Sequence, residues 1–260
     1  MWLAQAYAGL KKTADAVDAA AAAMVAWGPR IANRRNAAES LRQVIGQSPD
    51  LDAYVAQLDR QTQASGLDRP IVRKAIGQVY LARREHAKAI RQLTLAMQSQ
   101  PNDAETHQAL LSCYDQMGDK QGAIEQLLRW RDLARRDIKL YEDLGNRYRA
   151  IGRPSETERA FTSIVEVLPA EAESHQRLAE IRQRENRWGD AVAQWRQTAR
   201  IRALEPTGLL GLAQALIHEH RGEEAAEALA KLKQTSWPAR FGNVSDQVRA
   251  LEQQLRTERH

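Results

Sequence analysis

The central part of the sequence repeats with a period of 34 residues. One position of each copy holds a small or slim residue, and the copies follow one another without an insertion. Tyrosine, alanine and large apolar residues tend to recur 3, 12 and 16 positions after this landmark. Such a period predicts paired helices that stack into an array, because a single pair cannot bury its apolar face alone. The landmark residues are Gly77, Leu111, Gly145, Ala179 and Ala213.

The period predicts five helix–turn–helix repeats over residues 70–239. Each copy holds two amphipathic segments joined by a short polar turn. Pro101 and Pro169 close the first and third copies, where a helix must end before the next begins. Numbered one to five in chain order, the predicted repeats are 70–103, 104–137, 138–171, 172–205 and 206–239.

The segments outside the repeats predict further helices. Residues 1–29 predict a helical hairpin in which Trp2 and Ala6 have the spacing of a repeat's first helix, so we expect the chain to begin inside a repeat, as a piece of a longer protein. Residues 30–69 break the period and predict a degenerate helical pair or a linker. Residues 240–260 predict a capping helix with one polar face, which a stacked array needs at its end.

Composition is consistent with an all-helical protein. Hydrophobic residues make up 43% of the chain but aromatic residues only 5%, which is typical of an alanine- and leucine-rich helical protein and not of a β-sandwich. No segment approaches the 18 or so uncharged apolar residues of a membrane span. The alanine run at 19–26 follows charged residues and does not resemble a signal peptide. The sequence leaves the compartment open, with the cytoplasm as the default expectation.

The repeats resemble the tetratricopeptide repeat (TPR), a helix–turn–helix unit of the same length. In repeat one, Gly77, Tyr80 and Leu93 match landmarks of the family, whereas Arg73 replaces the expected early tryptophan. Repeat four departs most, because Arg182 stands at the tyrosine position. The resemblance implies an all-α, right-handed α-solenoid whose concave groove is lined by the first helix of each pair. It also implies a non-enzymatic scaffold that binds a peptide segment or a partner protein.

Positions three before, one after and four after each landmark are expected to point into this groove. They are mostly polar and rich in amides, with an apolar end at Leu210 and Ile217. Any one of them could equally be an ordinary solvated helix position. The candidate peptide-binding residues from this pattern are Lys74, Gln78, Gln108, Ser112, Glu142, Asn146, Arg149, Gln176, Glu180, Gln183 and Gln214.

Some TPR domains bind the C-terminal carboxylate of chaperones with lysine, asparagine and arginine side chains from three successive first helices. Lys74 and Lys139 match the lysines of this clamp, and Lys139 joins the candidate groove residues for that reason. Ala109 stands where an asparagine is needed, and Asp143 stands where an arginine is needed. Because an aspartate repels a carboxylate, the sequence argues against a chaperone partner.

The charge distribution leaves a second function open. The net charge is +5, and residues 69–136 hold twelve basic and seven acidic residues. An α-solenoid that binds nucleic acid is therefore the alternative to a protein-binding scaffold. Five excess charges without interleaved aromatic residues are few for that role, which argues against nucleic acid. The basic residues of the alternative are Arg83, Arg84, Lys88, Arg91, Arg129, Arg131, Arg135 and Arg136.

No pattern in the chain predicts catalysis, a cofactor or a metal site. Glycine-rich phosphate loops, paired catalytic carboxylates and Ser/His/Asp patterns are missing from the sequence. His218 and His220 are two residues apart and lie on different faces of a helix. His107 and His175 occupy a column of large residues, which predicts a packing role. The single cysteine, Cys113, rules out an internal disulfide and is expected to be a buried thiol.

Overall fold

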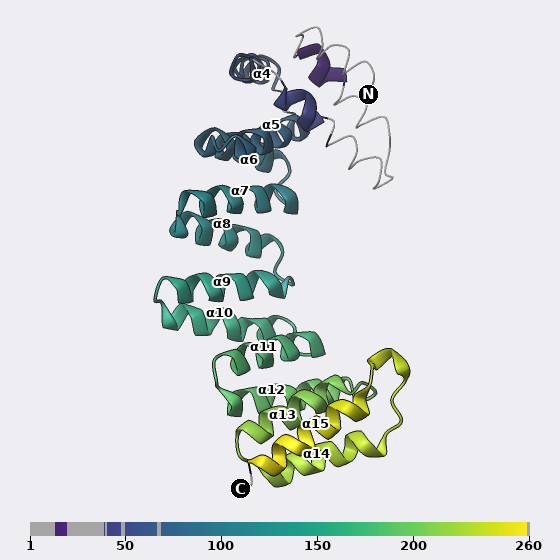
Figure 1. Ribbon diagram of the computed structural model, residues 1–260. Helices are drawn as coiled ribbons and strands as arrows, with labels where there is room; N and C mark the ends of the chain where they lie inside the picture. Colours follow the sequence, from purple (N-terminus) through teal and green to yellow (C-terminus); the bar gives the residue numbers. More distant parts are fainter. Residues whose placement is uncertain (1–13, 20–38, 40, 48–49, 67–68, 259–260) are drawn as a thin grey trace. The chain divides into compact units, whose positions relative to one another are not determined.

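The computed structural model describes residues 14–19, 39, 41–47, 50–66 and 69–258 (Figure 1). These residues form helices and connecting turns without a strand, which confirms the all-α prediction. Most of the predicted N-terminal hairpin lies outside the described residues. None of the described helices has the length and apolar character needed to cross a membrane. The chain divides into two compact units, Met1–Ala134 and Arg135–His260.

Successive helices of one unit pack on one another. In the first unit, α5 packs on α6, α6 on α7, and α7 on α8. In the second unit the same order runs from α9 to α15, and α15 contacts both α13 and α14. The first unit contains helical residues at 14–19 and 41–46, then α4 (Leu51–Ser65), α5 (Pro70–Ala82), α6 (His86–Ser99), α7 (Ala104–Met117) and α8 (Lys120–Leu133). The second unit contains α9 (Ile138–Ala150), α10 (Pro154–Val167), α11 (Ala172–Arg184), α12 (Trp188–Ile201), α13 (Thr207–His218), α14 (Gly222–Gln234), the 3-10 turn Ala239–Phe241 and α15 (Val244–Thr257).

Two of the landmark residues, Gly77 and Gly145, lie where the two helices of a repeat cross. A Cβ atom added to Gly77 would lie 2.6 Å from Cγ of Leu93 and 3.3 Å from the carbonyl oxygen of Ala89. One added to Gly145 would lie 2.2 Å from Cε1 of Phe161. These contacts confirm the packing expected from the sequence: a small residue allows close approach, and a large residue sixteen positions later fills the space beside it.

All five repeats turn between their helices in the same way. The residue seven positions after the landmark has a left-handed backbone, with φ between 56° and 71°. The next residue donates its N–H to the carbonyl of the tyrosine column at 2.8–3.0 Å, which is the bond of a Schellman motif. Only two of the five turn residues are glycine, so the fold imposes this conformation on three residues that disfavour it. The five are Arg84, Gly118, Gly152, Asn186 and His220.

Helix α4 is joined to repeat one by two carboxylates on one of its faces. Asp52 accepts hydrogen bonds from Tyr80 at 2.5 Å and from Lys88 at 2.7 Å. Asp59 accepts one from the buried Arg73 at 2.9 Å. These contacts hold α4 against repeat one.

Helix α15 covers the last repeat. Val248 and Leu255 are buried in the same apolar cluster as Ile217 of α13, whereas Arg249 on the other side of α15 is exposed. Ile217 has no exposed surface, so its predicted place at the apolar end of the groove is wrong. The reason is that α13, the first helix of repeat five, packs against α12, α14 and α15.

Candidate functional site

In the first unit, two carboxylates balance the positive charge of the candidate Lys74. The Nζ atom of Lys74 lies 3.1 Å from Oδ2 of Asp103 and 3.0 Å from Oε2 of Glu105. Burial raises the pKa of Asp103, but hydrogen bonds from Thr106 and the charge of Lys74 outweigh burial, and the net pKa is lowered. Asp103 therefore stays charged, and Lys74 is engaged within its own unit.

The other candidates of the first unit make local contacts. Oε1 of Gln78 accepts a hydrogen bond from Arg42 at 3.0 Å. The Ser112 hydroxyl donates to the Gln108 carbonyl one turn earlier, at 2.9 Å, and the Gln108 side chain is exposed. Of the four candidates in this unit, Gln108 is therefore the most accessible to a partner.

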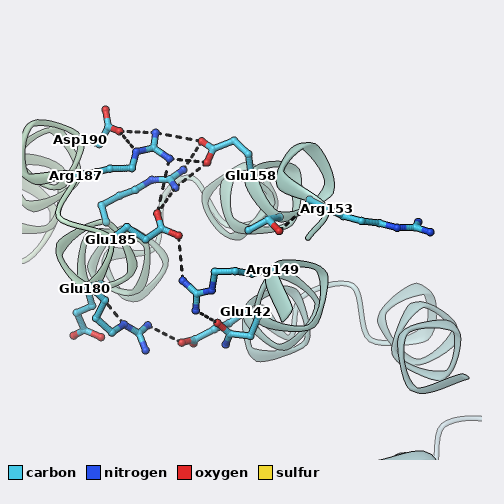
Figure 2. Close-up of polar contacts among 12 residues, drawn as sticks. Glu142, Arg149, Arg153, Glu158, Glu180, Glu185, Arg187 and Asp190 are labelled. Carbon is cyan, nitrogen blue, oxygen red and sulfur yellow. Dashed lines mark hydrogen bonds and ion pairs between the residues drawn. The ribbon is translucent and has the colours of Figure 1, made fainter. Parts of the chain in front are cut away.

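In the second unit, candidates on α9 form ion pairs with residues of α11 and of the turn after it (Figure 2). Glu142 of α9 lies between two arginines of α11, 2.9 Å from Nη2 of Arg184 and 3.3 Å from Nε of Arg177. Its side chain is only 15% exposed. The two first helices of repeats three and four are thus joined along the predicted binding surface.

Arg149 connects this surface to the turn of the next repeat. Its Nη2 donates to Oδ1 of Asn146 at 2.7 Å, and its Nη1 lies 3.4 Å from Oε1 of Glu185 (Figure 2). The guanidinium also stands over the Phe161 ring, 5.6 Å from the centroid. Although half of the side chain is exposed, these three contacts fix its direction.

Five further candidates differ in their surroundings. Gln176 donates to Oε1 of Glu180 at 3.0 Å. The Nε2 atom of Gln183 is buried and has no hydrogen-bond partner among the described residues. Gln214 is exposed on α13. Lys139 is also exposed and borders a separate cavity of about 290 Å³, which lies against the loop before α11.

The sequence analysis missed a charged cluster next to this surface. Arg182 is 3% exposed, and its two terminal nitrogens contact both oxygens of Glu158 at 2.6 and 2.9 Å. It also lies 3.0 Å from Glu185. Arg187 contacts Glu158 at 2.7 Å and Asp190 at 2.5 Å (Figure 2). We call these five residues, together with Arg149, the arginine hub.

The electrostatics of the hub favour a charged Glu158. Burial raises the pKa of this carboxyl, but hydrogen bonds from Arg187 and Arg182 and their charges outweigh burial, so the net pKa is lowered. The sequence shows that Arg182 replaces the tyrosine in repeat four. It does not show the partner of Arg182, because Glu158 belongs to the preceding repeat.

The histidine predicted to pack in repeat two does so. His107 is fully buried, and its Nε2 donates to the carbonyl of Pro101 at 2.8 Å. Its Nδ1 therefore accepts from Gln126, at 2.7 Å. Tyr141 and His175, in the same column, also contact the carbonyl six residues earlier, at 3.0 Å in both cases. These bonds tie the start of a first helix to the loop before it.

The remaining residues of chemical interest are structural. No group of three or more metal-binding side chains occurs in the part of the chain that the structure describes. Cys113 is buried, and burial raises its pKa to about 11, which keeps the thiol protonated and unreactive.

Several cations of the nucleic-acid alternative already have partners. Lys88 and Arg91 contact Asp52 and Asp59 of α4, both at 2.7 Å. The Arg83 guanidinium donates to a backbone carbonyl at 2.8 Å. In addition, Arg135 and Arg136 belong to the second unit and the other six cations to the first. The charge that remains for phosphate contacts is smaller than the sequence count indicates.

The helix pairs recur with a 34-residue period, small residues lie at the helix crossings, and one turn geometry occurs in all five repeats. The fold of this chain is that of the tetratricopeptide repeat. No protein-family model matches the chain, and no curated protein matches it.

Solved structures of several TPR-like proteins are similar to this chain. A structure of MamA is 19% identical, with a TM-score of 0.42, over 62% of this chain and 88% of that one. A structure titled YrrB, a TPR protein with an unusual peptide-binding site, is 12% identical, with a TM-score of 0.44, over 75% and 97%. MamA 41-end from Desulfovibrio magneticus RS-1 is 17% identical, with a TM-score of 0.42, over 65% and 95%.

Proposed function

We propose that this TPR protein is a scaffold that binds a segment of a partner protein on the first-helix surface of its second unit, formed by α9 and α11. One observation carries the proposal: polar side chains on this surface are exposed or half-buried, and contacts within and between the two helices hold them in place. Glu142 and Arg149 are fixed by residues of α11 and its C-terminal turn. Such preorganisation lowers the entropy lost when a partner binds.

The chemistry of the surface suits an extended peptide with mixed polarity. Asn146 and Gln176 offer amide groups that can donate to and accept from a peptide main chain. Arg149 uses two of its five N–H donors in the contacts described above, which leaves donors for a carbonyl or carboxylate of the partner. Arginine and glutamate side chains are interspersed on this surface, so no single sign of charge is favoured in the partner.

A peptide-display experiment tests the proposal. Short random peptides are selected on the full chain, and the affinity of the selected peptides is measured by fluorescence polarisation. Arg149→Ala is compared with Arg159→Ala, which removes an exposed arginine from the second helix of the same repeat. We expect Arg149→Ala to weaken binding by about tenfold or more and Arg159→Ala to leave it unchanged.

Two results would contradict the proposal. Equal affinities for the two variants would place binding outside the α9–α11 surface. Salt-sensitive binding of single-stranded RNA, with no peptide selected, would instead favour the nucleic-acid alternative.

A further inference from the structure

The arginine hub joins repeats three and four at the point where α10 is followed by α11. Repeat three supplies Arg149 from α9 and Glu158 from α10. Repeat four supplies Arg182 from α11 and Glu185 and Arg187 from the turn before α12. Each of the two glutamates contacts more than one arginine, so the hub links three helices and a turn through two carboxylates.

We propose that the hub is an acid-sensitive latch, in which the charged carboxylate of Glu158 holds repeat four against repeat three and its neutralisation releases α11 and α12. The inference concerns the stability of the junction and does not depend on a bound partner.

The burial of Arg182 makes the latch sensitive to a single charge. Its guanidinium is 3% exposed and cannot lose its proton in a protein. When Glu158 is neutral, Arg182 keeps only Glu185, which it shares with Arg149. A buried charge without adequate compensation is strongly unfavourable, so the equilibrium shifts toward conformations in which Arg182 reaches water.

The other members of the hub and the groups beside it do not replace Glu158. From α9 come Arg149 and the neutral Asn146, and from the start of α12 comes Asp190, which contacts Arg187 at 2.5 Å. On α10, Glu156 forms an ion pair with Arg153 at 3.5 Å and none with the arginines of the hub among the described residues. Glu158 contacts Arg182 at 2.6 Å and Arg187 at 2.7 Å, whereas Glu185 contacts Arg182 at 3.0 Å and Arg187 only at 3.8 Å.

The direction of the pH effect follows from the contacts. Because the pKa of Glu158 is lower in the folded chain than in the unfolded chain, the latch contributes its full stability above the ordinary glutamate pKa of about 4.3. This contribution is lost as the pH falls through the lower, folded pKa. The latch therefore holds at neutral pH and opens in acid.

Hydrogen exchange measured by mass spectrometry on the full chain tests the latch. Glu158→Gln removes the charge and keeps the shape, and Glu156→Gln is the matched control two residues away on the same helix. At neutral pH we expect amides of α11 and α12 to exchange about tenfold faster in Glu158→Gln, with α5–α8 unchanged. Glu156→Gln should match the wild type throughout.

A second variant separates the latch from a general loss of stability. Replacing Arg182 by Leu in the Glu158→Gln background removes the stranded charge, and the exchange of α11 and α12 should slow again. The proposal is overturned if Glu158→Gln and Glu156→Gln exchange alike. It is also overturned if Glu158→Gln accelerates all helices of the second unit equally, because the hub would then stabilise the whole unit and not one junction.

Discussion

Repeats three and four reach the same backbone geometry with different side chains. In repeat three, the turn residue is Gly152 with φ of 70°, and the closing hydrogen bond to the Tyr148 carbonyl is 3.0 Å. In repeat four, the turn residue is Asn186 with φ of 57°, and the bond to the Arg182 carbonyl is 2.8 Å. The backbone of the repeat therefore tolerates an arginine in the tyrosine column and an asparagine in the turn.

The two repeats differ in where their stabilising contacts come from. The tight contact of repeat three joins Gly145 to Phe161, and both residues belong to that repeat. The buried Arg182 of repeat four depends on Glu158, which belongs to repeat three. The apolar contact at this crossing is completed within one repeat, whereas the buried charge takes one of its partners from a neighbour. Four substitutions or conditions test this difference.

The largest effect is expected from adding a methyl group at the helix crossing of repeat three. Gly145→Ala places Cβ 2.2 Å from the buried Phe161 ring, so the ring or the helices must move. We expect the free energy of unfolding to fall by about 2–3 kcal/mol, measured by urea denaturation. The double variant Gly145→Ala with Phe161→Leu should be more stable than Gly145→Ala alone. A single variant as stable as the wild type would show that the crossing is not tightly packed.

Removing the partner of Arg182 is expected to cost somewhat less. Glu158→Ala leaves the buried guanidinium with Glu185, and the Glu158 side chain is itself 45% exposed. We expect a loss of about 2 kcal/mol, below the range for a fully buried pair. Glu156→Ala, which breaks an exposed pair, should change stability by less than about 0.5 kcal/mol. Equal losses for the two variants would mean that Arg182 does not need Glu158.

Substitutions at the turn residues should change stability less, and with opposite sign in the two repeats. Gly152→Ala puts a side chain on a left-handed residue and should destabilise by about 1 kcal/mol. Asn186→Gly relieves a milder strain and should stabilise by about 0.5 kcal/mol or less. Thermal denaturation followed by circular dichroism compares the two. If both variants lower the melting temperature, the asparagine side chain has a role in the turn beyond its backbone conformation.

Acid should reduce the difference between wild type and Glu158→Gln. The lowered pKa of Glu158 stabilises the folded wild type at neutral pH, and this contribution disappears as the carboxylate is protonated below its folded pKa. Urea denaturation over a pH series should therefore show two curves that converge as the pH falls below the glutamate range. A constant difference down to the lowest pH would exclude Glu158 as the titrating group.

The 34-residue period predicted the repeats well because a landmark glycine contacts a large side chain of its own repeat. Gly77 and Gly145 are small for a reason that acts within one repeat, and the residue that needs the space always follows at the same distance. The buried role of His107 was predicted in the same way, from its column.

Contacts between different parts of the chain could not be predicted from the period. Lys74 is neutralised by Asp103 of its own repeat and Glu105 of the next, and Ile217 is buried in a cluster that includes residues of α15. Equivalent positions of the repeats show which residue types all repeats share. These contacts depend instead on side chains that occur in one repeat. The candidate surface was therefore predicted as a set of outward positions, and the pairing of Glu142 with α11 was found only in the structure.

The carboxylate of Glu158 in repeat three pairs with Arg182 of repeat four, and this pairing limits how an array of such repeats can be lengthened, shortened or transplanted. A recombination break between Val167 and Ala172 would keep both helix pairs whole and still separate Arg182 from Glu158. The smallest piece that could be moved into another array with its charges balanced is therefore the block from α9 to α12. For this part of the chain, gene duplication or repeat grafting should succeed in steps of two repeats and fail in steps of one.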